Sequence, residues 1–369
     1  MPIAAVIPQP NHAVELREIP LPDLELNSAV LAVELSEVCG TDVYLQRGLL
    51  AGVPYPLIPG HVSVGRLEKI QGHMKDVNGK DFSEGDRVTF LDVHRTCNAC
   101  WYCLVAKATT RCPQRKVYGI TYGTEDGPSG GWASQIYLKP GTICLRLETE
   151  PELFMAGGCA LPTALHAVER AEIRLGETVL VLGSGPVGLN VILLSLLRGA
   201  SQVFCIGAPA HRLDAALSAG ATGVLNFQEH SESDCVDWLR DKGPTGILPD
   251  VTIEATGDPD AVIQAMRYTR DAGRVVVVGQ YTDHGPVSTK VAFNPHLDLN
   301  KKHLDIHGCW GSDFSHFYRA VQLVSDPRHS SSWTKLQPNL SRFTLNQANE
   351  ALAAVASAGV LKALIDPRA

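Results

Sequence analysis

Residues 178–188 have the sequence TVLVLGSGPVG. The first five form a short β-branched and apolar run, which predicts a buried parallel strand. It passes directly into Gly183-Ser184-Gly185-Pro186-Val187-Gly188 and then into an apolar helical segment. A glycine turn in this context predicts a dinucleotide site, because the first glycine permits a tight bend, the second lets the backbone approach a pyrophosphate, and the third lets helix pack on strand. The N-terminus of the helix would then face the phosphates.

The residues that follow continue the alternation of strands and helices. We expect helices at residues 212–219 and 260–268, and strands at residues 203–206, 224–226, 251–254 and 274–278. This rhythm predicts an α/β domain with a doubly wound parallel sheet.

The end of the second strand bears on which dinucleotide is bound. An acid at this position usually accepts a hydrogen bond from the 2′-hydroxyl of the adenosine ribose. This chain has Gly207 there, followed closely by His211 and Arg212. Without the acid a 2′-phosphate meets no repulsion, and either basic residue could hold it. The pattern leaves NAD and NADP open and slightly favours NADP.

Four cysteines are clustered in one short segment. Cys97, Cys100, Cys103 and Cys112 follow the spacing C-x₂-C-x₂-C-x₈-C, which can close a tetrahedral shell of four thiolates around Zn²⁺. An iron–sulfur centre is the main alternative, but its run of cysteines lacks the eight-residue gap. A disulfide framework is less well matched, because the chain starts without the pattern of a secretory leader. We expect a closed, structural zinc site.

A second set of metal ligands is spread along the chain. Cys39, His61 and Cys159 supply two thiolates and one imidazole, the three-ligand set of a catalytic zinc with one position left for water or substrate. Asp42 is of the right type to orient the imidazole of His61. Each residue by itself also fits an ordinary packing role.

Five motifs occur in an order that resembles the zinc-dependent medium-chain alcohol dehydrogenases, in the branch with two zinc ions. They are Cys39-Gly-Thr-Asp42, Gly60-His61, the four-cysteine segment, Gly158-Cys159 and the glycine turn at residues 183–188. The resemblance covers essentially the whole chain. It implies a GroES-like β-barrel catalytic domain formed by residues 1–157 and 297–369, with a structural-zinc lobe at about 94–115, and a Rossmann domain at residues 158–296.

The resemblance also implies roles for individual residues. Thr41 would bond the alcohol and start a proton relay, with Tyr44 beyond it. The catalytic zinc would be held by Cys39, His61 and Cys159. The nicotinamide cofactor would contact Thr163, Gly183, Ser184, Gly185, Pro186, Val187, Gly188, Gly207, His211, Arg212, Val278 and Gly279.

The chain departs from the family pattern at two positions near the open metal site. Val62 follows His61, where the family commonly has a glutamate able to approach the zinc. Tyr44 stands where many members have the outer histidine of the relay, and a phenol is a poor base at neutral pH. Leu49, Asp92, Val93 and His94 are candidates for lining the substrate pocket, and the two polar side chains among them favour a polar substrate.

The composition narrows the class of partner. The net charge of −7 and a pI near 6.0 argue against nucleic acid or an anionic membrane. We expect a cytoplasmic homodimer or homotetramer that binds two zinc ions per subunit and transfers a hydride between NAD(P) and a small alcohol or carbonyl compound. A reductase of a conjugated C=C or iminium substrate is the alternative enzyme. A nucleotide-binding regulatory protein is the alternative outside catalysis.

Overall fold

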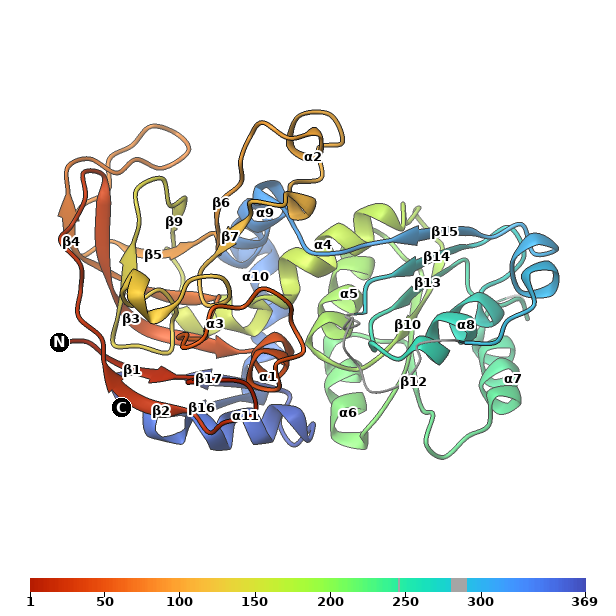
Figure 1. The fold of residues 1–369 in the computed structure, drawn as a ribbon. Helices are drawn as coiled ribbons and strands as arrows, with labels where there is room; N and C mark the ends of the chain where they lie inside the picture. The colour runs from red at the N-terminus through yellow and green to blue at the C-terminus, as the bar shows by residue number, and fades with distance from the viewer. Residues whose placement is uncertain (245, 280–290) are drawn as a thin grey trace. The chain divides into compact units, whose positions relative to one another are not determined.

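The computed structural model describes residues 1–244, 246–279 and 291–369, which divide into two compact units (Figure 1). The first unit contains Met1–Cys159, Asp313–Ser330 and Asn339–Ala369. The second contains Ala160–Ser312 and Ser331–Pro338. Residues 297–312, expected with the first unit, therefore fall within the second.

The second unit is built on a six-stranded sheet in which every pairing is parallel, in the order β12-β11-β10-β13-β14-β15. Its strands are β10 (Thr178–Leu182), β11 (Gln202–Gly207), β12 (Gly223–Asn226), β13 (Val251–Glu254), β14 (Arg274–Val277) and β15 (Asp305–Gly308). The prediction of a doubly wound parallel sheet is confirmed. The strand order reverses between β10 and β13, which is where sheets of this kind bind ligands.

One helix precedes the strands of this sheet and the others connect them. They are α4 (Ala160–Arg170), α5 (Pro186–Leu197), α6 (Ala210–Ala219), α7 (Glu232–Lys242), α8 (Pro259–Tyr268) and the short η3 (Pro295–Asn300). One core cluster joins Leu239 of α7 and Met266 of α8 to Leu180 and Phe204 of the sheet, and all four side chains are buried. Helix α5 begins directly after Gly185, so its N-terminus lies at the end of β10.

The first unit is built on a mostly antiparallel sheet in the order β16-β17-β3-β4-β5-β9, with β8 paired to β3. Its strands are β3 (Ser28–Val38), β4 (Ser63–Gln71), β5 (Arg87–Phe90), β8 (Gln135–Leu138), β9 (Cys144–Arg146), β16 (Leu340–Phe343) and β17 (Lys362–Ile365). Two small sheets pair β1 (Ile3–Val6) with β2 (Glu15–Glu18), and β6 (Val93–Arg95) with β7 (Lys116–Val117).

The remaining helices range from four to twelve residues. They are α1 (Gly40–Gln46), α2 (Trp101–Leu104), α3 (Pro151–Gly157), α9 (Phe314–Ser325), α10 (Pro327–Thr334) and α11 (Ala348–Ala356). Short 3₁₀ turns lie at Thr109–Arg111, Thr124–Asp126, Gln337–Asn339 and Leu345–Gln347. The long strand β3 is central, since it pairs with β17, β4 and β8. It ends immediately before Cys39, so the sheet fixes where that residue lies.

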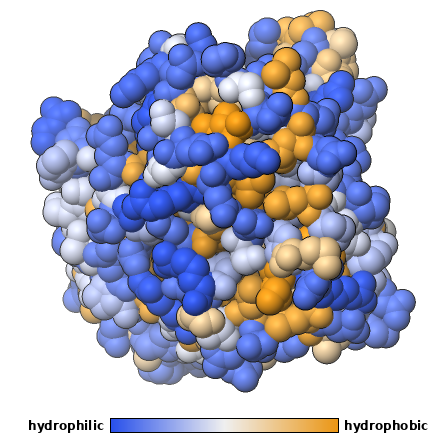
Figure 2. All heavy atoms as spheres, turned by 90° about the vertical axis from the view of Figure 1, so that its left-hand side faces the viewer, coloured by the Kyte–Doolittle hydropathy of each residue, from blue (hydrophilic) through white to orange (hydrophobic). Residues whose placement is uncertain are grey.

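One face of the first unit is drawn in Figure 2, where hydrophilic side chains predominate and apolar ones form patches between them. The exposed apolar residues of this unit include Ile3 on β1 and Leu16 on β2. Among the described residues, no helix has the length and apolar character needed to cross a membrane.

Candidate active site and metal centres

Three residues that are distant in sequence meet at one point of the first unit. The ligand atoms of Cys39, His61 and Cys159 all lie within 4.8 Å of one another. His61 Nε2 and Cys159 Sγ are 3.2 Å apart. The imidazole is buried and both cysteines are half-buried. This arrangement brings together the three predicted ligands of the open zinc site.

Cys39 is placed by the start of helix α1. It occupies the N-cap position with extended backbone, and its N–H donates to Asp42 Oδ2 at 2.8 Å. Its sulfur lies 3.8 Å from Thr41 Oγ1. The capping bond to Asp42 therefore fixes both the thiol and the hydroxyl that was predicted to bind alcohol.

Asp42 links this helix end to the histidine loop. Its side chain is fully buried, and Oδ1 accepts from Gly60 N at 3.4 Å and lies 3.7 Å from His61 Nδ1. Nδ1 is buried without a hydrogen-bond partner, and Nε2 faces Cys159. A tautomer with its proton on Nδ1 would leave the Nε2 lone pair toward the sulfurs. That is the state a neutral imidazole ligand needs, so the residues fit a metal ion.

The electrostatics of the site also suit a cation. A hydrogen bond from Cys159, followed by contacts with His61, lowers the pKa of Cys39 well below its usual value. Burial is the main cause that raises the pKa of Asp42. A lowered pKa favours the thiolate form, which is the form that binds metal, and soft thiolate ligands select zinc over magnesium or calcium.

The four cysteines of the second set also converge. The ligand atoms of Cys97, Cys100, Cys103 and Cys112 lie within 4.8 Å of one another, and all four thiols are free. Two sulfur pairs, Cys100–Cys103 and Cys97–Cys112, are each 3.5 Å apart. Backbone N–H groups point at the sulfurs, with Cys97 N 3.3 Å from Cys112 Sγ and Cys100 N 3.3 Å from Cys97 Sγ. Four thiolates in this geometry fit a closed tetrahedral zinc site.

The glycine turn after β10 has the shape that a dinucleotide requires. Gly183 has a φ of +106°, and a Cβ on Gly188 would lie 1.9 Å from the Gly183 carbonyl oxygen. A Cβ on Gly185 would meet nothing within 4 Å. The first and third glycines are therefore required by the protein itself, whereas the second leaves open space at the N-terminus of α5. That space suits a phosphate group.

The other predicted cofactor residues lie at strand ends and on helices of the second unit. Gly207 ends β11, and His211 and Arg212 lie in the first turn of α6, exposed and half-buried respectively. Val278 and Gly279 follow β14, and Thr163 is half-buried on α4.

Sequence reasoning missed Glu254, the buried last residue of β13. Its carboxylate accepts from Gly279 N at 3.2 Å and from Thr256 N at 2.6 Å. A charged residue at the end of an apolar strand is the signal in the sequence that could have identified Glu254. In the structure its carboxylate joins two loops at this edge of the sheet.

The candidate pocket residues differ in how many of their polar atoms are bonded within the protein. Tyr44 and Leu49, on α1 and just after it, are half-buried. His94 is fully engaged elsewhere: Nδ1 is 2.5 Å from Tyr122 Oη and Nε2 is 3.0 Å from Pro140 O. Because both ring nitrogens are bonded, His94 gives less support to a polar substrate than the sequence suggested.

Comparison with known families gives two matches that together span most of the chain. Residues 26–149 match the alcohol dehydrogenase GroES-like domain, and residues 186–326 match the zinc-binding dehydrogenase domain. The 5-exo-hydroxycamphor dehydrogenase of Pseudomonas putida is 30% identical over 370 residues, which cover 98% of each chain.

Solved structures agree with these matches. An alcohol dehydrogenase from Thermotoga maritima superposes with a TM-score of 0.91 at 30% identity, covering 99% of both chains. A protein described as a zinc-binding dehydrogenase, from Sinorhizobium meliloti 1021 and bound to NADP, gives a TM-score of 0.83 at 25% identity over 100% of this chain and 99% of that one. This chain belongs to the zinc-dependent medium-chain dehydrogenase/reductase family.

Proposed function

We propose that this zinc-dependent oxidoreductase transfers a hydride between NADP and the carbinol carbon of a mainly apolar secondary alcohol, or to the matching ketone in reverse. The observation that carries the proposal is the convergence of Cys39, His61 and Cys159, which offers three protein ligands instead of four. The cysteine lobe instead offers four thiol ligands, which leave no open coordination position. We propose that this lobe binds the structural zinc.

Different groups of the protein would have different roles around the substrate oxygen. A zinc ion held by the three ligands supplies Lewis-acid stabilisation of negative charge on that oxygen. Thr41 Oγ1 lies 3.8 Å from Cys39 Sγ and would accept the proton of the alcohol, which Tyr44 on the same helix would carry outward. Asp42 holds the helix end and faces His61 Nδ1. The cofactor supplies the hydride chemistry, and the protein supplies alignment.

The substrate class is supported by two observations. The Pseudomonas putida relative is named for 5-exo-hydroxycamphor, a ring compound whose 5-hydroxyl is a secondary alcohol. Among the candidate pocket residues, Tyr44, Leu49 and Val93 are half-buried with mainly apolar side chains. The polar ones are Asp92, which is also half-buried, and His94, whose ring nitrogens both contact other partners. A mainly apolar alcohol fits this set better than a polyol does.

The choice of NADP is supported by the end of β11. Gly207 provides no carboxylate to repel a 2′-phosphate, and Arg212 lies in the first turn of the following helix. We also propose that the chain forms a homodimer or homotetramer, which light scattering on the purified protein can decide. The six thiols of the two metal sites favour a reducing compartment such as the cytoplasm.

The decisive experiment is a panel assay with NADPH and NADH on cyclic ketones, polyols, conjugated alkenes and the corresponding alcohols. We expect turnover of cyclic ketones with preference for NADPH, its loss after zinc is removed from the open site, and its return with added zinc. Turnover confined to conjugated alkenes, or full activity without that zinc, would falsify the proposal. Cys39→Ser should abolish turnover, with Cys144→Ser as the matched control, because Cys144 is a buried thiol outside both metal sites.

A further inference from the structure

A buried ion pair lies beside the open metal site and was not predicted from the sequence. Glu37 Oε1 and Lys362 Nζ are 3.0 Å apart, and each side chain is only 4% exposed. Glu37 lies on β3 and Lys362 on β17, which are neighbouring antiparallel strands. Burying two charges is costly unless their remaining groups are also bonded, so the other partners of this pair matter.

Those partners lie on the two sides of one turn. Glu37 Oε2 accepts from Cys159 N at 2.7 Å, and Lys362 Nζ donates to Gly157 O at 3.1 Å. Gly158 lies between the two bonded residues with a φ of +53°. A Cβ on Gly158 would come within 2.0 Å of Glu37 Oε2 and 2.5 Å of Lys362 Nζ, so glycine lets the turn pack directly on the pair.

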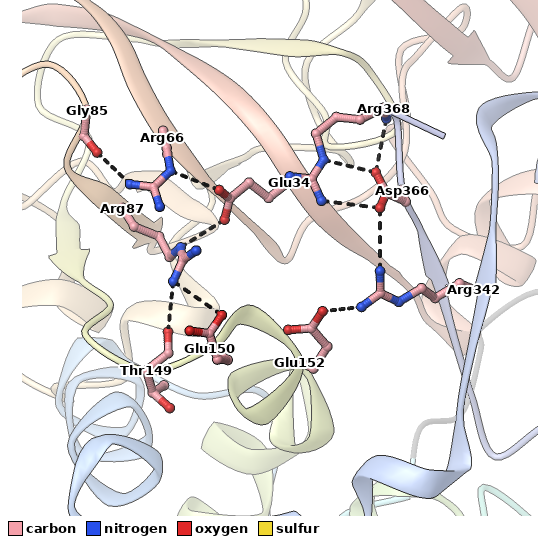
Figure 3. Close-up of polar contacts among 10 residues, drawn as sticks. All are labelled: Glu34, Arg66, Gly85, Arg87, Thr149, Glu150, Glu152, Arg342, Asp366 and Arg368. Atoms are coloured by element: carbon pink, nitrogen blue, oxygen red, sulfur yellow. Dashed lines mark hydrogen bonds and ion pairs between the residues drawn. The ribbon is translucent and has the colours of Figure 1, made fainter.

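The helix that leads into this turn is held at its other end as well. Figure 3 shows Arg87 contacting Thr149 and Glu150, just before α3, while Arg342 contacts Glu152 in its first turn. These side chains are more exposed than the buried pair, with Glu150 at 77% and Arg342 at 49%. Exposed ion pairs contribute little on average. The position of Cys159 therefore depends mainly on the buried contacts at the end of α3.

The pair also lies next to the position where the family pattern is broken. The backbone N–H of Glu37 donates to Val62 O at 3.0 Å. Val62 directly follows His61 and has no carboxylate. A buried glutamate is nevertheless hydrogen-bonded to that residue through its backbone, supplied from strand β3.

We infer that Glu37 and Lys362 are positioning residues of the open metal site, which hold the Cys159 turn so that its sulfur meets Cys39 and His61. The inference rests on the proposed function only in taking these three residues as zinc ligands. Neither member of the pair needs to touch substrate or cofactor. Loss of a partner that orients a metal ligand typically reduces metal affinity or activity by about 10- to 100-fold.

The experiment separates positioning from general stability. Glu37→Gln leaves the Lys362 ammonium unpaired, and Lys362→Met leaves the Glu37 carboxylate unpaired, so either change alone should destabilise the protein. The double variant E37M/K362M removes both charges, and replacing a whole buried pair with apolar side chains of similar size is often neutral or stabilising. It should therefore fold, although Cys159 N and Gly157 O lose their partners.

Metal readouts test the double variant without relying on turnover. We expect the zinc of the open site to pass to a chelator about 10- to 100-fold faster than in the wild type. The visible spectrum of Co²⁺ bound at this site should change in its thiolate-to-metal bands. Zinc in the four-cysteine lobe should be released at the wild-type rate, which makes it an internal control.

A matched control uses a different buried pair. Glu177 and Arg274, in the second unit, form an ion pair with side-chain exposures of 12% and 8%. Glu177→Gln should lower stability without changing metal release or the cobalt spectrum. Wild-type metal release and cobalt spectrum in E37M/K362M would overturn the inference. If the metal site of E37M/K362M is altered while the wild type turns over none of the substrate panel, the inference is supported and the proposed function is contradicted. The two failures are therefore distinguishable.

Discussion

Alanine substitutions at two glycines of the cofactor turn should have opposite effects on stability. Gly185 has a φ of −79° and a ψ of 179°, which any residue can adopt, and its added methyl would meet nothing within 4 Å. The methyl of an alanine at 188 would lie 1.9 Å from the Gly183 carbonyl oxygen, whereas ordinary contact begins at 3.4 Å. The backbone must then move by the difference, 3.4 − 1.9 = 1.5 Å.

These distances set the expected magnitudes. Overpacking of this kind costs about 1–3 kcal/mol, so Gly188→Ala should unfold at a clearly lower temperature. Gly185→Ala should be neutral or stabilising by up to about 1 kcal/mol, because alanine restricts the unfolded chain. Its methyl nevertheless occupies the space proposed for the pyrophosphate. Loss of one hydrogen bond to a charged group costs about 1.5–3 kcal/mol, which corresponds to about 10- to 150-fold in the dissociation constant.

Two measurements on the same samples test this reasoning. Thermal unfolding followed by circular dichroism gives the stability, and titration followed by NADPH fluorescence gives the dissociation constant. Gly185→Ala should bind NADPH more weakly while unfolding no earlier than the wild type. If it binds NADPH as tightly as the wild type, the pyrophosphate does not approach Gly185 and the assignment of the cofactor turn is refuted.

Three further changes have separate readouts. Cys100→Ser should remove one of the two bound zinc ions, measured by elemental analysis, and lower the unfolding temperature without changing NADPH affinity. Arg212→Ala should weaken the binding of NADPH by about 10- to 150-fold and leave the binding of NADH unchanged. An equal loss of affinity for both cofactors would contradict the role of Arg212 at the 2′-phosphate. Hydrogen bonding to Arg267 lowers the pKa of Asp298 below 3.8. The wild type should therefore be more stable than Asp298→Asn above that pH, and the advantage should fade as the pH falls below it, which urea unfolding across this range can measure.

The strands of the second unit that the sequence predicted are those with continuous apolar runs. β10 is buried at all five positions, and such a run is visible in a single sequence. β15 was missed because it is short and polar, with Asp305 and Gly308 exposed at its ends. An edge strand needs only one paired neighbour and little burial, so its residues carry no periodic signal. This is why residues 297–312, which include β15, were expected with the first unit, whereas they lie in the second.

The metal-ligand candidates were predictable for a chemical reason. Only a few side chains bind zinc, and Cys39, His61 and Cys159 can be recognised by type even when they are far apart in sequence. Glu37 and Lys362 could not be paired in the same way. Each appears in the sequence as a charge within a mostly apolar strand, and many such residues lie at a strand edge or in solvent. Only the antiparallel register of β3 and β17 shows that the two charges meet.

The relation between Val62 and Glu37 shows why a missing motif residue does not by itself describe a site. From the sequence, Val62 indicates that a carboxylate near the metal has been lost. In the structure, Glu37 lies beside Val62, is buried, and bonds the backbone of Cys159 directly. Its charge is balanced by Lys362, which fixes the carboxylate at the turn and away from free movement toward a metal. Glu37 is thus placed to hold a ligand and not to exchange one, and this difference follows from its partners, not from its residue type.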